Sequence, residues 1–311
     1  MAATHRHKAF GMDTKVGMIG IGLMGHGIAT NIVKRGFTLT VMDHPGNRPL
    51  DDLRAAGVRV AATAAAVAAD ADVVILCVTG SPQVEAVLTG PSGVLEGLRP
   101  GTIVVDCSTS IPSSTEKMAR AVQSAGGRFI DTPMTRLPQN ARDGTLNLLV
   151  GGDPAVLEEV RPVLSAFAEN ITYVGPAGAG HRMKLLHNFV SLGFMALLAE
   201  VAAHASIAGV EPAVLVDVLA QGGGAGVALQ RMSPAMLTGD AANVPFTLAN
   251  ACKDLGYYCV SAAESGAPHG IADTVAGMLE AAVSGGNGQA YVPQLAALLA
   301  QRRTTGPGSS G

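Results

Sequence analysis

The chain has 311 residues, with 21 lysines and arginines against 24 aspartates and glutamates, which gives a net charge of −3. Charged residues make up only 14% and hydrophobic residues 48%, a composition typical of a folded globular protein and not of a disordered one. The length predicts about two domains. The slightly acidic balance, together with the absence of tryptophan, argues against a nucleic-acid partner.

We expect no membrane-spanning segment, because the longest charge-free apolar stretch, 185–199, is shorter than the roughly 20 residues that a spanning helix needs. Residues 1–13 contain no apolar segment typical of a secretory signal, and we expect both 1–13 and 304–311 to be flexible or expression-derived tails. The four cysteines, Cys77, Cys107, Cys252 and Cys259, show no CxxC spacing. They indicate unpaired thiols in a cytoplasmic protein.

From residue 15 to about 175, short β-rich runs alternate with alanine-rich helical stretches. The predicted strands are Val16–Gly20, Thr38–Met42, Val73–Val78, Thr102–Asp106, Arg128–Asp131, Leu146–Val150 and Thr172–Val174. The predicted helices between them are Gly25–Arg35, Thr63–Asp70, Pro112–Ala125 and Pro154–Ala168. Continuous apolar strands that alternate with helices are typical of parallel sheets covered on both faces.

The pattern changes after residue 178, where Gly180–Gly209 is predicted to be one long helix. Further helices are expected near 211–220, 226–238, 246–265, 268–283 and 290–302. The sequence therefore predicts an α/β fold: a Rossmann-type doubly wound dinucleotide-binding domain over 14–177, followed by an all-α domain over 178–303. The long helix joins the two domains.

A glycine-rich turn follows the first predicted strand and opens the first predicted helix. It reads Gly20-Ile21-Gly22-Leu23-Met24-Gly25, a G-x-G-x-x-G pattern. In such a turn the first glycine permits the sharp bend, the second lets a pyrophosphate approach the backbone, and the third lets the helix pack against the strand. Gly20, Gly22 and Gly25, with the intervening Leu23 and Met24, are therefore predicted to bind a dinucleotide.

Asp43 ends the second predicted strand, 18 residues after Gly25, near the spacing of a ribose-binding acid. A carboxylate there accepts hydrogen bonds from the ribose hydroxyls of NAD and repels the 2′-phosphate of NADP. The alternative is an ordinary turn residue in Asp43-His44-Pro45-Gly46. NAD is therefore the predicted cofactor, with His44 as a further contact, but NADP stays open because Arg48 is close enough in sequence to accommodate a phosphate.

Four further segments occur in a fixed order: Asp106-Cys107-Ser108-Thr109-Ser110, Asp131-Thr132-Pro133-Met134-Thr135, Gly178-x-Gly180 followed by Lys184 and Asn188, and Lys253-Asp254-Leu255. Together with the glycine-rich turn, this series resembles the β-hydroxyacid dehydrogenase family, which includes 3-hydroxyisobutyrate dehydrogenase and tartronate semialdehyde reductase. The resemblance covers roughly residues 15–300. It implies hydride transfer between a nicotinamide cofactor and a short β-hydroxy acid or its semialdehyde or keto form.

The resemblance implies that Lys184 is the catalytic lysine, acting as general acid or base. Asn188 lies one helical turn later and would orient the lysine or the substrate oxygen. Lys253 matches a second active-site lysine, which would contact substrate or cofactor and lower the pKa of Lys184 as a nearby cation. Taken without the resemblance, Lys184 is more simply a solvated residue near a helix start.

Ser108 and Thr109 correspond to the family's substrate-carboxylate segment, with Thr109 also touching the cofactor; helix capping is the alternative role. Cys77, Val78 and Thr79, at the end of a predicted strand, are expected beneath the cofactor. The family's usual serine and paired glycines are replaced here by Thr135, Arg136 and Leu137. We hypothesise that Thr135 and Arg136 contact the substrate, with Arg136 pairing an acidic group on it; an exposed loop arginine is the alternative.

The sequence thus predicts an NAD(P)-dependent enzyme that acts on a small hydroxy acid or aldehyde acid, without a metal, a nucleic-acid partner or a membrane. Apolar helices in the second domain favour a homodimer or homotetramer. Two alternatives are an imine reductase of the same fold and a dinucleotide-binding regulatory protein without turnover. The particular substrate is not fixed, because the loop that would select it is the part that departs from the family pattern.

Overall fold

The structure is a computed structural model that describes residues 10, 11 and 13–301 of the chain. Most of the two predicted tails lies outside these residues. The chain divides into two compact units, one ending at Lys184 and the other beginning at Leu185. The division falls within the long helix α9 (Ala179–Ile207), a few residues after the predicted domain boundary at 177/178.

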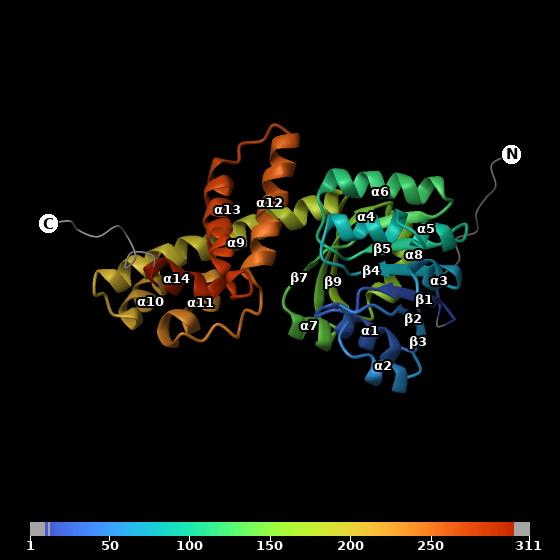
Figure 1. The fold of residues 1–311 in the computed structure, drawn as a ribbon, viewed down its shortest axis with the longest axis horizontal. Coiled ribbons are helices and arrows are strands. Elements are labelled where there is room, and N and C mark those ends of the chain that lie inside the picture. Colours follow the sequence, from blue (N-terminus) through green and yellow to red (C-terminus); the bar gives the residue numbers. More distant parts are fainter. Residues whose placement is uncertain (1–9, 12, 302–311) are drawn as a thin grey trace. The chain divides into compact units, whose positions relative to one another are not determined.

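The first unit is built on one sheet of nine strands within the described residues (Figure 1). The strands are β1 (Lys15–Ile19), β2 (Thr38–Met42), β3 (Arg59–Ala61), β4 (Val73–Leu76), β5 (Ile103–Asp106), β6 (Arg128–Asp131), β7 (Met134–Thr135), β8 (Leu146–Gly152) and β9 (Ala168–Gly175). Their order is β3-β2-β1-β4-β5-β6-β8-β7, and β9 pairs with β8. The order reverses beside β1, and ligands of such sheets bind at the carboxyl ends of the strands near that reversal.

Helices cover both faces of this sheet (Figure 1). One face packs against α1 (Gly25–Lys34), α2 (Asp51–Ala55), α7 (Pro138–Asp143) and α8 (Pro154–Leu164). The other packs against α3 (Ala64–Ala69), α4 (Ser81–Thr89), α5 (Val94–Gly97) and α6 (Pro112–Ser124). Side chains alternate across a strand, so neighbouring residues pack into the hydrophobic cores on opposite faces of the sheet. Met18 and Ile19 of β1 are an example. Burial on both faces explains the continuous apolar strands.

The predicted α/β class and the alternation of strands and helices are confirmed, and two features differ from the prediction. Strands β3 and β7 and helices α2, α4, α5 and α7 were not predicted. Apart from α4, each has six residues or fewer, too short to show a periodic pattern. The sheet is not wholly parallel, since β8 runs antiparallel to β6 and β7. The first six strands in the order are parallel throughout, and they form the dinucleotide-binding part.

The second unit is helical, as predicted. After α9 come α10 (Pro212–Ala220), α11 (Val227–Thr238), α12 (Leu248–Glu264), α13 (Gly270–Ala282) and α14 (Leu295–Gln301), with a short π-helical turn at Val283–Asn287 and a 3-10 turn at Val292–Gln294. Its core gathers apolar side chains from α9, α11, α12 and α13, including Leu192, Met232 and Leu255. A second hydrophobic core, separate from the sheet, therefore supports this unit.

Helix α9 is long and apolar enough to cross a membrane by length and composition, with a mean hydropathy of 1.6 over its most apolar 18 residues. In the structure one face of α9 packs into the helical core through Leu192, Met195 and Ala199. Such packing is typical of the core helix of a globular domain, which passes the same test.

Candidate functional site

The glycine-rich turn between β1 and α1 has the geometry of a dinucleotide cradle. Gly20 has a φ of +95°, and a Cβ there would lie 2.2 Å from the Cys77 carbonyl oxygen. A Cβ on Gly25 would lie 2.0 Å from the Gly20 carbonyl oxygen, whereas one on Gly22 would meet nothing within 4 Å. Gly20 and Gly25 thus permit the tight turn. Gly22 leaves open space beside the start of α1, where backbone N–H groups attract a phosphate.

Asn47 braces this turn from the loop after β2. Its Oδ1 accepts a hydrogen bond from the Ile21 N–H (3.1 Å), and its Nδ2 donates to the Met42 carbonyl (2.8 Å). The Arg48 N–H donates to the Ile21 carbonyl (2.8 Å). The 43–48 loop and the glycine-rich turn are therefore tied together, a role of Asn47 that the sequence did not indicate.

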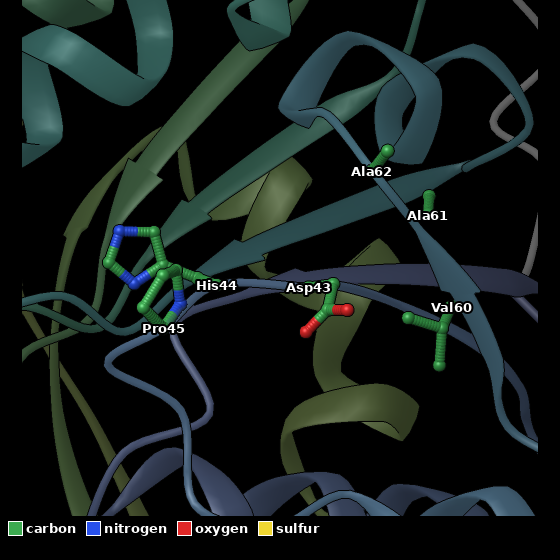
Figure 2. Close-up of a pocket in the computed structure, with 6 residues that line it drawn as sticks. All are labelled: Asp43, His44, Pro45, Val60, Ala61 and Ala62. Carbon is green, nitrogen blue, oxygen red and sulfur yellow. The ribbon is translucent and has the colours of Figure 1, made fainter.

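Beside this loop lies a hollow of about 550 Å³ lined by Asp43, His44, Pro45, Val60, Ala61 and Ala62. Figure 2 shows the Asp43 carboxylate between the His44–Pro45 pair and Val60. The carboxylate is exposed and lies 3.9 Å from the Arg54 guanidinium. The predicted ribose-binding residues Asp43 and His44 thus line one hollow at the ends of β2 and β3, where an adenosine would extend from the pyrophosphate turn.

The residues predicted beneath the cofactor follow β4 and β5, two neighbouring parallel strands. The Val78 N–H donates to Ser108 Oγ (3.1 Å), so the two strand ends are bonded to each other. Ser108 is buried, while Thr109 is half-buried and Thr79 is exposed. The structure therefore brings the predicted cofactor segment 77–79 and the predicted carboxylate segment 108–109 together at one sheet edge.

A buried group of polar side chains underlies segment 108–109. Asp106, Asp131 and His181 are each 0% exposed. Asp131 accepts hydrogen bonds from the N–H groups of Gly178 and His181, both at 2.8 Å. Burial raises the pKa of Asp131 above its ordinary value despite these bonds. The entry to α9 is thus anchored at the end of β6, which places Lys184, half-buried one turn later, on a fixed helix start.

The loop that departs from the family pattern is folded as α7. Arg136 precedes it with a φ of +80°, in the left-handed region that favours glycine. Its guanidinium donates to the Thr145 carbonyl and pairs with Glu169. Thr135 is buried and accepts from Asn147 Nδ2 (3.2 Å). A substrate carboxylate would therefore compete with Glu169 for Arg136, whose contact with a substrate stays a prediction.

In the second unit, Asn188 and Lys253 share one carboxylate. Asn188 Nδ2 donates to Asp254 Oδ2 (2.7 Å), and Lys253 Nζ forms an ion pair with Asp254 Oδ1 (2.8 Å). Asp254 is only 3% exposed, and the Lys253 ammonium lies 5.1 Å from the centre of the Tyr257 ring. The sequence predicted roles for Lys253 and Asn188 but none for Asp254, which orients both. The available signal was that Asp254 directly follows Lys253, so that two charged residues stand together in a mostly apolar helix.

Both parts of the chain are similar to known protein families. Residues 15–175 match the NAD binding domain of 6-phosphogluconate dehydrogenase, and residues 178–299 match the NAD-binding domain of NADP-dependent 3-hydroxyisobutyrate dehydrogenase. A 2-(hydroxymethyl)glutarate dehydrogenase from Eubacterium barkeri is 32% identical over 82% of this chain and 84% of its own length. The chain belongs to the β-hydroxyacid dehydrogenase family.

Other relatives of this dehydrogenase family extend the comparison. A 3-hydroxyisobutyrate dehydrogenase from Mycobacterium tuberculosis, solved with L-serine, has a TM-score of 0.83 at 28% identity and covers 92% of this chain and 99% of its own. The cytokine-like nuclear factor N-PAC of Xenopus tropicalis is 35% identical over 73% of the chain. The chain spans 42% of the length of this N-PAC relative.

Family membership identifies the ligand that the glycine-rich turn and the Asp43 hollow of the first unit bind. The β-hydroxyacid dehydrogenases are NAD(P)-dependent oxidoreductases, and residues 15–175 form the NAD-binding domain. The open space at Gly22 and the hollow beside Asp43 fit a dinucleotide whose pyrophosphate lies at the start of α1. NAD(P) is therefore the cofactor of this chain.

Proposed function

We propose that this chain interconverts a short β-hydroxy acid and its semialdehyde or keto form, with Lys184 as general acid and base. The observation that carries the proposal is the placement of Lys184 and Asn188 four residues apart on α9, immediately after the NAD-binding domain. Side chains at this spacing lie on the same face of a helix. Ser108 and Thr109 are the proposed holders of the substrate carboxylate.

The chemistry requires a hydride and a proton. The bound nicotinamide supplies or accepts the hydride. In the reducing direction the Lys184 ammonium donates a proton to the developing alkoxide, and in the oxidising direction its amine removes the hydroxyl proton. Asp254 holds the Asn188 amide, so the Asn188 side chain keeps one orientation while it positions the substrate oxygen or the lysine.

We propose NAD as the preferred dinucleotide. The exposed Asp43 carboxylate lines the hollow at the end of β2 and would accept hydrogen bonds from the ribose hydroxyls. It would also repel a 2′-phosphate. Arg54, 3.9 Å from Asp43, is the cation that works against this preference.

The proposal is tested by following NADH and NADPH oxidation with a panel of semialdehydes and keto acids. We expect Lys184→Ala to lower kcat/KM by about 100- to 10,000-fold, because it removes the proton donor. The dissociation constant for NADH should stay within about threefold, since no change is made in the dinucleotide cradle. Lys117→Ala, which removes an exposed lysine of α6 that pairs with Glu85, is the matched control and should keep full activity.

The second candidate is a dinucleotide-binding protein without turnover, favoured by the similarity to a protein named as a nuclear factor. The same experiment separates the two functions. Binding of NADH with no turnover of any carbonyl acid supports the second, and turnover that survives in Lys184→Ala overturns the proposed role of the lysine. Imine reduction is tested by adding cyclic imines to the panel.

We also propose that the chain forms a homo-oligomer through its helical unit. Leu186, Val190, Phe194 and Leu197 form an exposed apolar stripe on α9, opposite the face that packs into the core. The stripe carries no charge, and a second copy of the same helix is an apolar partner of matching length. The four cysteines are free, and we propose a cytoplasmic location on that ground.

A further inference from the structure

The first turn of α9 is capped by a residue from a distant strand. Asp131, at the end of β6, accepts the N–H groups of Gly178 and His181, which have no partner within the helix itself. The fit is close, because a Cβ on Gly180 would lie 2.4 Å from the Leu149 carbonyl oxygen and 2.6 Å from Asp131 Oδ2. The start of α9 can therefore shift little while these contacts hold.

The His181 side chain adds two hydrogen bonds to two other elements. Its Nε2 lies 3.0 Å from the Ser108 carbonyl oxygen, and its Nδ1 lies 2.8 Å from Thr115 Oγ1 in α6. A carbonyl oxygen can only accept, so Nε2 carries the hydrogen of the first bond. One buried ring thus joins α9, the segment after β5 and the first turns of α6.

Two carboxylates flank this ring. Asp131 Oδ2 lies 3.6 Å from Nδ1, and Asp106 Oδ2 lies 3.9 Å from Nε2. Asp106 Oδ1 accepts from the Ser108 N–H (2.9 Å), while its Oδ2 is buried with no hydrogen-bond partner among the described residues. Removing the imidazole would leave the Ser108 carbonyl without its donor beside two buried carboxylates, whereas the Thr115 hydroxyl would keep only its bond to the Ile111 carbonyl (3.2 Å). The surrounding backbone can satisfy the Ser108 carbonyl only by moving.

We propose that His181 is a positioning residue that fixes the segment Ser108–Thr109 relative to the helix start that carries Lys184. His181 precedes Lys184 by three residues, nearly one helical turn, and contacts the carbonyl of Ser108 directly. The inference rests on the proposed function, since it links the carboxylate holder to the proton donor. A shift of about 1 Å between such groups can lower a rate by roughly 100-fold.

The test compares His181→Ala and His181→Gln with the control Arg182→Ala. Arg182 is the exposed neighbour on α9, and its guanidinium pairs with Glu116. Thr115→Val removes the partner of Nδ1, together with the hydroxyl bond to the Ile111 carbonyl within α6, and keeps both backbone bonds to Asp131, so it remains informative if His181→Ala fails to fold. Each variant is measured for kcat, KM, the pH profile of kcat/KM and amide hydrogen exchange.

We expect His181→Ala to lower kcat on the accepted carbonyl acid by about 10- to 100-fold and to displace the limb of the pH profile that reports Lys184. His181→Gln should recover part of kcat, because its amide can still donate to the Ser108 carbonyl. Thr115→Val should lower kcat by a smaller factor in the same direction. Arg182→Ala should leave all these quantities unchanged.

Hydrogen exchange supplies a readout that does not need turnover. His181→Ala should accelerate exchange in both 107–112 and 178–186, and Arg182→Ala should accelerate it in neither. If folded His181→Ala and Thr115→Val keep kcat, the pH profile and the exchange of 107–112, the positioning role is overturned. If the parent itself turns over no carbonyl acid, the proposed function fails. Faster hydrogen exchange of both 107–112 and 178–186 in His181→Ala would then still show that His181 holds the two segments together.

Discussion

At the scale of single residues, burial changes the chemistry of two thiols at the sheet edge. Desolvation, with a smaller effect of the Asp106 charge, raises the pKa of the Cys77 thiol to about 12. The pKa of Cys107 is also raised well above the ordinary value of 9.0, again mainly by burial. The folded state favours the neutral Cys77 thiol more than the unfolded state does. The stability that the folded protein owes to this difference is complete below pH 9 and is lost as the pH rises through about 12.

We therefore predict that Cys77 resists alkylation in the folded protein. At pH 8 a rise in pKa from 9 to about 12 lowers the thiolate fraction about a thousandfold, and the thiolate is the nucleophile. Iodoacetamide labelling followed by peptide mass spectrometry should show slow modification of Cys77 in the native protein and rapid modification in urea. Equal rates in the two states at pH 8 would contradict the prediction.

The site residues that could be predicted from the sequence are those whose role is set by their neighbours in the chain. The glycine-rich turn and Asp43 could be predicted because a strand, a turn and a second strand follow one another along the chain. Asn47, Asp131 and His181 were missed as structural residues because their partners lie on other elements, as when Asp131 reaches Gly178, 47 residues away. No local spacing encodes such a contact.

At the scale of elements, α7 shows how a short helix depends on its neighbour. Asn31 of α1 is buried, and its Nδ2 donates to the carbonyls of Ala141 (2.8 Å) and Arg142 (3.1 Å) near the end of α7. A Cβ on Gly27 would lie 2.7 Å from Ala141 C and from Arg142 N. The absence of a side chain at Gly27 therefore lets α7 approach the helix that begins at the pyrophosphate turn.

We predict that Gly27→Ala destabilises the first unit by about 1–3 kcal/mol, since the added methyl group overlaps the α7 backbone. The same substitution at Gly277 in α13, where a Cβ would meet nothing within 4 Å, is the control. It should raise stability slightly, by about 0.5–1 kcal/mol, because alanine favours a helix interior. Urea unfolding followed by circular dichroism measures both changes, and an unchanged midpoint for Gly27→Ala would refute the close packing.

The predicted elements were those with a strong local signal. Strand Thr38–Met42 and strand Arg128–Asp131 have the predicted bounds, and α6 and α8 begin at the predicted prolines. The two-residue strand β7 owes its existence to pairing with β8, at Thr135 and Asn147 for example. Its sequence alone carries no period, so the reversal of direction in this part of the sheet could not be predicted.

At the scale of the whole molecule, the low charge of the chain is accompanied by exposed apolar side chains on the helical unit. Val214 and Val218 of α10 are 57% and 63% exposed, in addition to the apolar stripe of α9. The α9 stripe runs over 11 residue steps, about 17 Å of helix. Under the proposed homo-oligomer, a second copy would cover this apolar surface, while the same helix contributes its opposite face to the core.

We predict that the parent chain elutes as a dimer or larger assembly in size-exclusion chromatography with light scattering. Val190→Glu combined with Leu197→Glu should shift it towards the monomer, because each interface would bury unpaired carboxylates at a penalty on the order of several kcal/mol. Ile271→Glu, at a residue of α13 that is 74% exposed and outside the stripe, is the matched control and should leave the assembly unchanged. A parent that is monomeric at micromolar concentration, or that pellets with phosphatidylcholine vesicles, would show that the stripe does not bind a second copy.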